Sequence, residues 1–261
     1  MSRYINILAA LTASAFAFAV PAFADQKPTV VLVHGAFAES NSWNSVVREL
    51  EKDGYPVVGA ANPLRSVKGD AEYVSAILSG IKGPVVLVGH SYGGSVISNA
   101  ANGHDNVKAL VYVAAFAPEA GETAFELTGK FPGSTLGPTL AEPVTLPDGG
   151  HDLYIKQDEF PKQFAADVPL AEAKLMAAGQ RPVAEAALKE PAGTAAWKTV
   201  PSWFVYGDAD KNIPPLAMAW MADRAKSQET VVVKGASHVL MVSHPEKVSE
   251  VIETAARSVE N

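Results

Sequence analysis

The most informative stretch of the chain is Val85-Val86-Leu87-Val88-Gly89-His90-Ser91-Tyr92-Gly93-Gly94. It begins as an apolar, β-branched run, which is typical of a buried parallel strand, and it leads into residues 95–101, which have the pattern of a short helix. A strand that turns so sharply into a helix holds the central serine in a strained backbone conformation, so the residues two positions away need to be glycine. The sequence therefore predicts that Ser91 is a nucleophile on a tight strand-to-helix turn, with the first amides of the helix facing the same site.

Strand and helix patterns alternate on both sides of this turn. Strands are expected at 29–35, 55–60 and 107–114, with helices at 42–52 and 70–79. After residue 197 the alternation resumes, with strands at 202–207 and 229–234 and helices at 215–225 and 245–259. This order predicts an α/β fold with a mostly parallel sheet of about six strands and helices on both faces.

The middle of the chain has a different texture. Residues 118–197 combine prolines, glycines and alanine-rich stretches without a clear buried strand. We expect a small helical cap inserted after the fourth strand, with the core formed by residues 25–117 and 198–261. Loops at the carboxyl ends of parallel strands carry specificity in such folds. The alternative is an ordinary helical elaboration with no role in substrate selection.

The amino terminus has the features of a secretory signal peptide. One positive charge precedes an apolar run from Ile5 to Val20, and small residues at Ala22 and Ala24 match a cleavage site. We expect residues 1–24 to be removed by a cut after Ala24, which would make the protein periplasmic or secreted. The alternative is an uncleaved anchor, for which the run is short.

Composition narrows the possible partners and cofactors. A formal net charge of −7 provides no basic footprint for nucleic acid and no polybasic patch for an anionic membrane. The absence of cysteine excludes thiol nucleophiles and thiolate metal ligands. The six histidines form no dense cluster with acids, so we expect neither a catalytic metal nor a cofactor. The oligomeric state is not indicated.

A serine hydroxyl needs a base oriented by a carboxylate before it can attack. Asp208 and Asp210 follow the strand at 202–207, and His238 follows the next strand. This gives the chain order serine, acid, histidine. His244 lies near the start of the last helix, and the remaining histidines outside the first strand and the serine motif, His104 and His151, lie in a loop and in the cap.

These motifs together resemble the α/β-hydrolase superfamily, in particular compact bacterial carboxylesterases and, more distantly, plant methyl esterases and hydroxynitrile lyases. In such proteins the acid is followed within a few residues by proline, as in Asp210-Lys211-Asn212-Ile213-Pro214, so the resemblance implies Asp210 and His238 as partners of Ser91. It also implies an oxyanion hole formed by the backbone amides of Tyr92 and of Ala36 in His34-Gly35-Ala36, with Phe37 as a less favoured donor and His34 bracing the loop.

The expected function is hydrolysis of carboxylic esters with small to medium apolar groups through an acyl-enzyme. Candidate pocket residues are aromatic, although each is more often ordinary packing: Phe37, Trp43, Phe116 and Tyr154, with Phe160 and Trp197 as further possibilities. Lactone opening and other acyl-transfer chemistry remain open. Lyase chemistry is disfavoured, because similar hydroxynitrile lyases carry threonine and lysine where this chain has Gly35 and Val239. The alternative from another class is a non-catalytic ligand-binding protein.

Overall fold

The computed structural model describes residues 27–259, so the expected signal peptide at 1–24 lies outside the described residues. Six strands form one sheet in which every neighbouring pair is parallel. Their order across the sheet is β2 (Val57–Ala60), β1 (Thr29–Val33), β3 (Val85–His90), β4 (Val107–Val113), β8 (Ser202–Gly207) and β9 (Glu229–Val233). The predicted α/β fold with a mostly parallel sheet of about six strands is confirmed.

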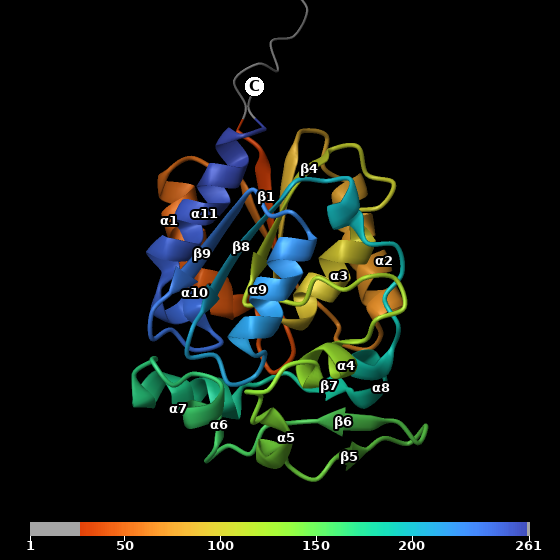
Figure 1. The fold of residues 1–261 in the computed structure, drawn as a ribbon, viewed down its shortest axis with the longest axis vertical. Helices are drawn as coiled ribbons and strands as arrows, with labels where there is room; N and C mark the ends of the chain where they lie inside the picture. Colours follow the sequence, from red (N-terminus) through yellow and green to blue (C-terminus); the bar gives the residue numbers. More distant parts are fainter. Residues whose placement is uncertain (1–26, 260–261) are drawn as a thin grey trace, which may run out of the picture.

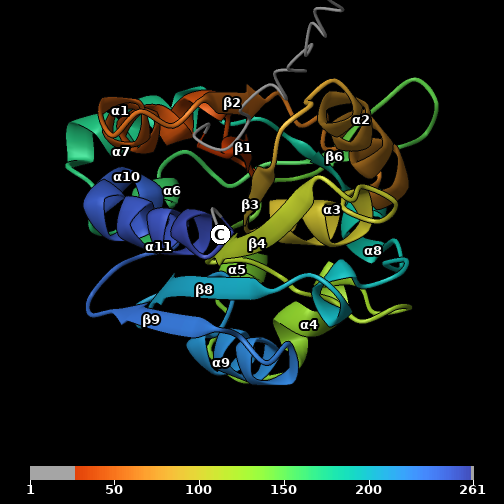
Figure 2. The same ribbon diagram turned by 90° about the horizontal axis from the view of Figure 1, so that it is seen from above.

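Helices cover both faces of the sheet (Figure 2). One face carries α1 (Asn44–Lys52) and α11 (Pro245–Arg257), and the other carries α2 (Val67–Ser79), α3 (Tyr92–Ala100) and α9 (Pro215–Arg224). The central strand β3 is buried along its whole length, which explains its continuous apolar sequence. On α1 and α11 the buried residues recur at helical spacing while the charged residues face solvent.

The chain between β4 and β8 forms the cap, which lies at the carboxyl ends of the parallel strands (Figure 1). Its helices are α4 (Ala124–Gly129), α5 (Leu136–Thr139), α6 (Phe160–Gln163), α7 (Leu170–Ala178) and α8 (Glu185–Lys189). A short helix of the core, α10 (Leu240–Ser243), precedes α11.

The expected helical cap also contains strands. They form a three-stranded antiparallel sheet of β5 (Val144–Thr145), β6 (His151–Leu153) and β7 (Val183–Ala184). Strands of two or three residues are too short to show alternation in a sequence. The turn between β5 and β6 contains Asp148-Gly149, and the Gly149 amide donates to the Leu146 carbonyl at 2.9 Å.

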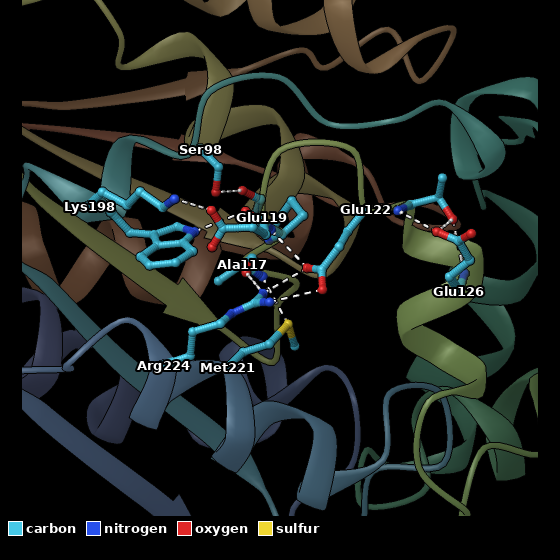
Figure 3. A network of polar contacts seen from close by, with 12 residues as sticks. Ser98, Ala117, Glu119, Glu122, Glu126, Lys198, Met221 and Arg224 are labelled. Carbon is cyan, nitrogen blue, oxygen red and sulfur yellow. Dashed lines mark hydrogen bonds and ion pairs between the residues drawn. The ribbon is translucent and has the colours of Figure 1, made fainter.

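A network of polar contacts joins the two segments that connect the core and the cap (Figure 3). We call these segments, residues 117–122 and 195–200, the neck. The Arg224 guanidinium on α9 donates to both carboxylate oxygens of Glu122, at 2.9 and 2.8 Å, and to the Ala117 carbonyl at 2.7 Å. On the returning segment, the Trp197 indole donates to the Pro118 carbonyl at 3.0 Å. The two crossings are therefore tied both to each other and to the core.

Among the described residues, no helix has the length and apolar character needed to cross a bilayer.

Candidate active site

Ser91 lies at the turn between β3 and α3, with φ 54° and ψ −123°. This backbone conformation is strained for a residue with a side chain, and it points the hydroxyl away from both flanking elements. The turn brings the backbone on its two sides so close together that there is no room for a side chain at Gly89. A β-carbon on Gly89 would lie 2.6 Å from the Gly93 carbonyl oxygen. The glycine spacing in the sequence thus follows from the close packing of this turn, residues 89–93, which we call the elbow.

The structure brings Ser91, His238 and Asp210 together, although they are far apart in the sequence. Ser91 Oγ lies 2.8 Å from His238 Nε2, and His238 Nδ1 lies 2.6 Å from Asp210 Oδ2. All three side chains are buried. The second carboxylate oxygen, Asp210 Oδ1, accepts the backbone amides of Asn212 and Ile213 at 2.7 and 3.1 Å. This geometry lets the imidazole accept the serine proton while the carboxylate holds the ring in the correct tautomer.

Asp208, the other acid after β8, has a different setting. Its side chain lies on the surface, and its Oδ1 accepts the Gly235 amide at 2.6 Å. It therefore links the loops after β8 and β9 and does not contact His238. The hydrogen bonds of the two acids therefore differ: Asp210 contacts His238, and Asp208 accepts a backbone amide.

The loop after β1 lies directly against the nucleophile. A β-carbon on Gly35 would lie 2.6 Å from the Ser91 β-carbon, so only glycine fits there. Among residues 27–259, the amides of Ala36 and Tyr92 donate to no protein acceptor, whereas the Phe37 amide donates to the Arg181 carbonyl at 3.1 Å. The two unoccupied donors are the pair expected from the sequence, and the less favoured donor, Phe37, is already engaged.

Two buried histidines flank the site without entering the triad. His90 Nε2 donates to the His238 carbonyl at 3.0 Å, and the two ring centroids are 4.8 Å apart. Burial lowers the pKa of His90 well below its ordinary value, and the neighbouring His238 adds to that effect. Burial also lowers the pKa of His34, whose Nδ1 donates to the Gly35 carbonyl at 3.0 Å. Both rings therefore stay neutral near pH 7 and brace the loops on either side of the serine.

A cavity of about 710 Å³ opens above Ser91 between the core and the cap. Its lining is mostly apolar, and it includes Ser91, His238 and both residues of the expected oxyanion hole. Most of the apolar walls come from the cap: Ala124, Phe125, Phe131, Pro132, Leu136, Leu140, Ala141, Pro143, Leu153, Phe164 and Leu188. A volume of this size matches sites that enclose small organic molecules.

Of the aromatic residues expected in the pocket, Phe37 and Phe116 line the cavity. Trp43 and Tyr154 do not, so their assignment is corrected. Trp43 is completely buried behind the elbow, with its ring edge-on to His90 at 6.3 Å. The Tyr154 carbonyl accepts the Ala141 amide at 2.8 Å within the cap, away from the lining. Aromatic residues near a motif in the sequence can thus belong to the layer behind the site.

The further candidates Phe160 and Trp197 also lie outside the lining. Phe160 packs against Phe164, with ring centroids 4.8 Å apart, and Trp197 belongs to the neck. Phe164 was not expected from the sequence, yet its ring lies 5.0 Å from the His238 ring and forms part of the cavity wall.

Within residues 27–259 no group of three or more histidines and acids is placed to hold a metal ion.

The chain is similar to known proteins over most of its length. Residues 30–251 match the alpha/beta hydrolase family. The chain is 27% identical over 252 residues to alpha/beta hydrolase nvfD of Aspergillus novofumigatus, a match covering 88% of this chain and 97% of that protein. It is 24% identical over 254 residues to an alpha-hydroxynitrile lyase of Arabidopsis thaliana, covering 89% and 98%. The crystal structure of polyneuridine aldehyde esterase shares the fold, with a TM-score of 0.76 and 18% identity over 88% of this chain and 99% of that one. The chain belongs to the alpha/beta hydrolase family.

Proposed function

We propose that the protein is a serine esterase that cleaves carboxylic esters with small to medium apolar groups. The observation that carries this proposal is the continuous contact from Ser91 Oγ through His238 to Asp210, at 2.8 and 2.6 Å, at the floor of an apolar cavity. A nucleophile, a base and an oriented acid are the groups that acyl transfer requires. The unoccupied amides of Ala36 and Tyr92 beside them supply the donors for a developing oxyanion.

In the proposed cycle, His238 Nε2 takes the Ser91 proton as Oγ attacks the ester carbonyl carbon. The carbonyl oxygen becomes an oxyanion held by the two amides. His238 then gives the proton to the departing alkoxide as the ester C–O bond breaks, which leaves an acyl group on Ser91. A water molecule deprotonated by His238 attacks this acyl-enzyme and releases the carboxylic acid, so one ester and one water become one acid and one alcohol.

The test is hydrolysis of p-nitrophenyl esters from acetate to long acyl chains by the wild type, Ser91→Ala and His238→Ala. The proposal predicts a preferred chain length in the wild type and a loss of at least about 10³-fold in both variants. A folded wild type no more active than Ser91→Ala on every ester would contradict it. Parallel assays on lactones, amides and cyanohydrins then separate the other acyl-transfer and lyase reactions, and ligand binding without turnover would indicate a non-catalytic role.

A further inference from the structure

The cap contacts the loop that carries the acid as well as covering the cavity. Gln163, the last residue of α6, is almost fully buried against the segment after β8. Its side-chain Nε2 donates to the Lys211 carbonyl at 2.9 Å and to Asn212 Oδ1 at 3.1 Å. In return, Asn212 Nδ2 donates to the Gln163 carbonyl at 3.2 Å. Three hydrogen bonds thus join one cap residue to the two residues that follow Asp210.

The orientation of the Gln163 amide is itself fixed within the cap. Thr135 Oγ1 donates to Gln163 Oε1 at 2.8 Å, so the amide nitrogen must face Lys211 and Asn212. The Thr135 backbone amide also donates to the Lys211 carbonyl, at 2.9 Å. Because every polar atom of this buried amide has a partner, the network can hold a single arrangement.

The contact continues from Asn212 to the acid. The Asn212 backbone amide donates to Asp210 Oδ1 at 2.7 Å, and this bond directs the other oxygen toward His238. We propose that Gln163 is a positioning residue: it holds the Asp210–Asn212 segment so that Asp210 keeps its contact with His238. This inference rests on the proposed function and assigns the cap a part in catalysis beyond substrate binding.

The two halves of the acid–base pair are anchored differently. The backbone of His238 is held from the core, because His90 on β3 donates to its carbonyl at 3.0 Å, while Phe164 of the cap packs against its ring with centroids 5.0 Å apart. Asp210 follows β8 in the core, but its loop is fastened from the cap by Gln163. Loss of Gln163 should therefore loosen the acid while leaving the base and the nucleophile in place.

The test compares two buried glutamines of the cap, each replaced by methionine, which has a similar volume and no amide. Gln163→Met removes the two hydrogen bonds that the Gln163 side chain donates to Lys211 and Asn212. Gln180→Met is the matched control, since Gln180 is also buried and its side chain bonds only to the cap residues Ile155 and Ala177, each at 2.9 Å. Both variants leave buried polar groups unpaired, so both should lower the melting temperature by a similar amount.

The proposal predicts that only Gln163→Met lowers kcat for p-nitrophenyl esters, by at least about tenfold, with KM changed less than about twofold. Equal kcat in the two variants, with both folded, would overturn it. Glu122→Gln weakens the attachment of the cap at the neck and is a second control. Its kcat should not show the decrease expected for Gln163→Met. If Gln163→Met fails to fold, Thr135→Val removes the hydroxyl that orients the amide, and kcat unchanged in that variant would equally overturn the proposal.

A second readout needs no turnover. The proton between His238 Nδ1 and Asp210 Oδ2 should give a low-field proton NMR resonance in the wild type and in Gln180→Met. In Gln163→Met this resonance should broaden or shift upfield, and an unchanged resonance would overturn the positioning role. Because this measurement is independent of hydrolysis, an inactive wild type would contradict the proposed esterase without deciding the role of Gln163.

Discussion

Asp210→Asn should inactivate the protein by reversing one hydrogen bond. In the wild type, Asp210 Oδ1 accepts the amides of Asn212 and Ile213, and Oδ2 accepts His238 Nδ1. Asparagine must keep its oxygen toward the two backbone donors, so its NH₂ group replaces Oδ2 and donates to Nδ1. The His238 proton then lies on Nε2, facing Ser91, where the imidazole can no longer accept the serine proton.

The expected loss in kcat is about 10⁴-fold, equivalent to about 5 kcal/mol in the activation barrier, because the wrong tautomer blocks the first proton transfer. The assay is steady-state hydrolysis of the preferred p-nitrophenyl ester, with circular dichroism melting to verify the fold. Asp208→Asn is the matched control, because its side-chain oxygen can still accept the Gly235 amide. Its kcat should stay within about twofold of the wild-type value, which is less than about 1 kcal/mol in the activation barrier. A folded Asp210→Asn variant that keeps more than about a tenth of the wild-type kcat would refute the assignment.

Three further outcomes follow from packing and charge. Gly89→Ala forces a β-carbon to within 2.6 Å of the Gly93 carbonyl oxygen, and it should lower the free energy of unfolding by at least about 1–3 kcal/mol in urea titrations. Gly83→Ala meets nothing within 4 Å and serves as its control. Leu136→Trp fills part of the cavity, so kcat/KM for long-chain esters should fall at least about tenfold relative to acetate, and an unchanged profile would place the acyl chain elsewhere. Burial lowers the folded-state pKa of His90, so the unfolded state binds more protons below about pH 6.5 and stability falls as the pH drops, by up to about 1.4 kcal/mol per pH unit. Unfolding at pH 5.5 and 7.5 should show a shallower dependence in His90→Gln, and an equal slope in both proteins would contradict this assignment.

The parts of the fold and site that follow from local geometry could be predicted from the sequence. The elbow needs glycine at 89 and 93 because backbone atoms occupy the space of a side chain, so its spacing is visible without a structure. The parallel strands are equally visible, because burial on both faces demands continuous apolar runs. The choice of Asp210 over Asp208 came from a proline pattern of the resembling family, and the hydrogen bonds of the two acids now distinguish them.

What could not be predicted depends on contacts that form only after folding. Gln163 lies in a segment with no recognisable pattern, and its partners Thr135 and Asn212 are distant in sequence. Trp43 was a candidate for the pocket as an aromatic residue, but its side chain packs into the buried layer against His90. The cap sheet could not be predicted because its strands have only two or three residues, too few to show an alternating pattern.

The most direct test of the central claim is covalent labelling of the wild type by a fluorophosphonate, followed by peptide mass spectrometry. An activated serine in contact with His238 should react quickly and give a single adduct on Ser91, and His238→Ala should react at least about 10³-fold more slowly. No adduct, an adduct on another residue, or equal labelling of the wild type and His238→Ala would contradict the claim that Ser91 is an activated nucleophile.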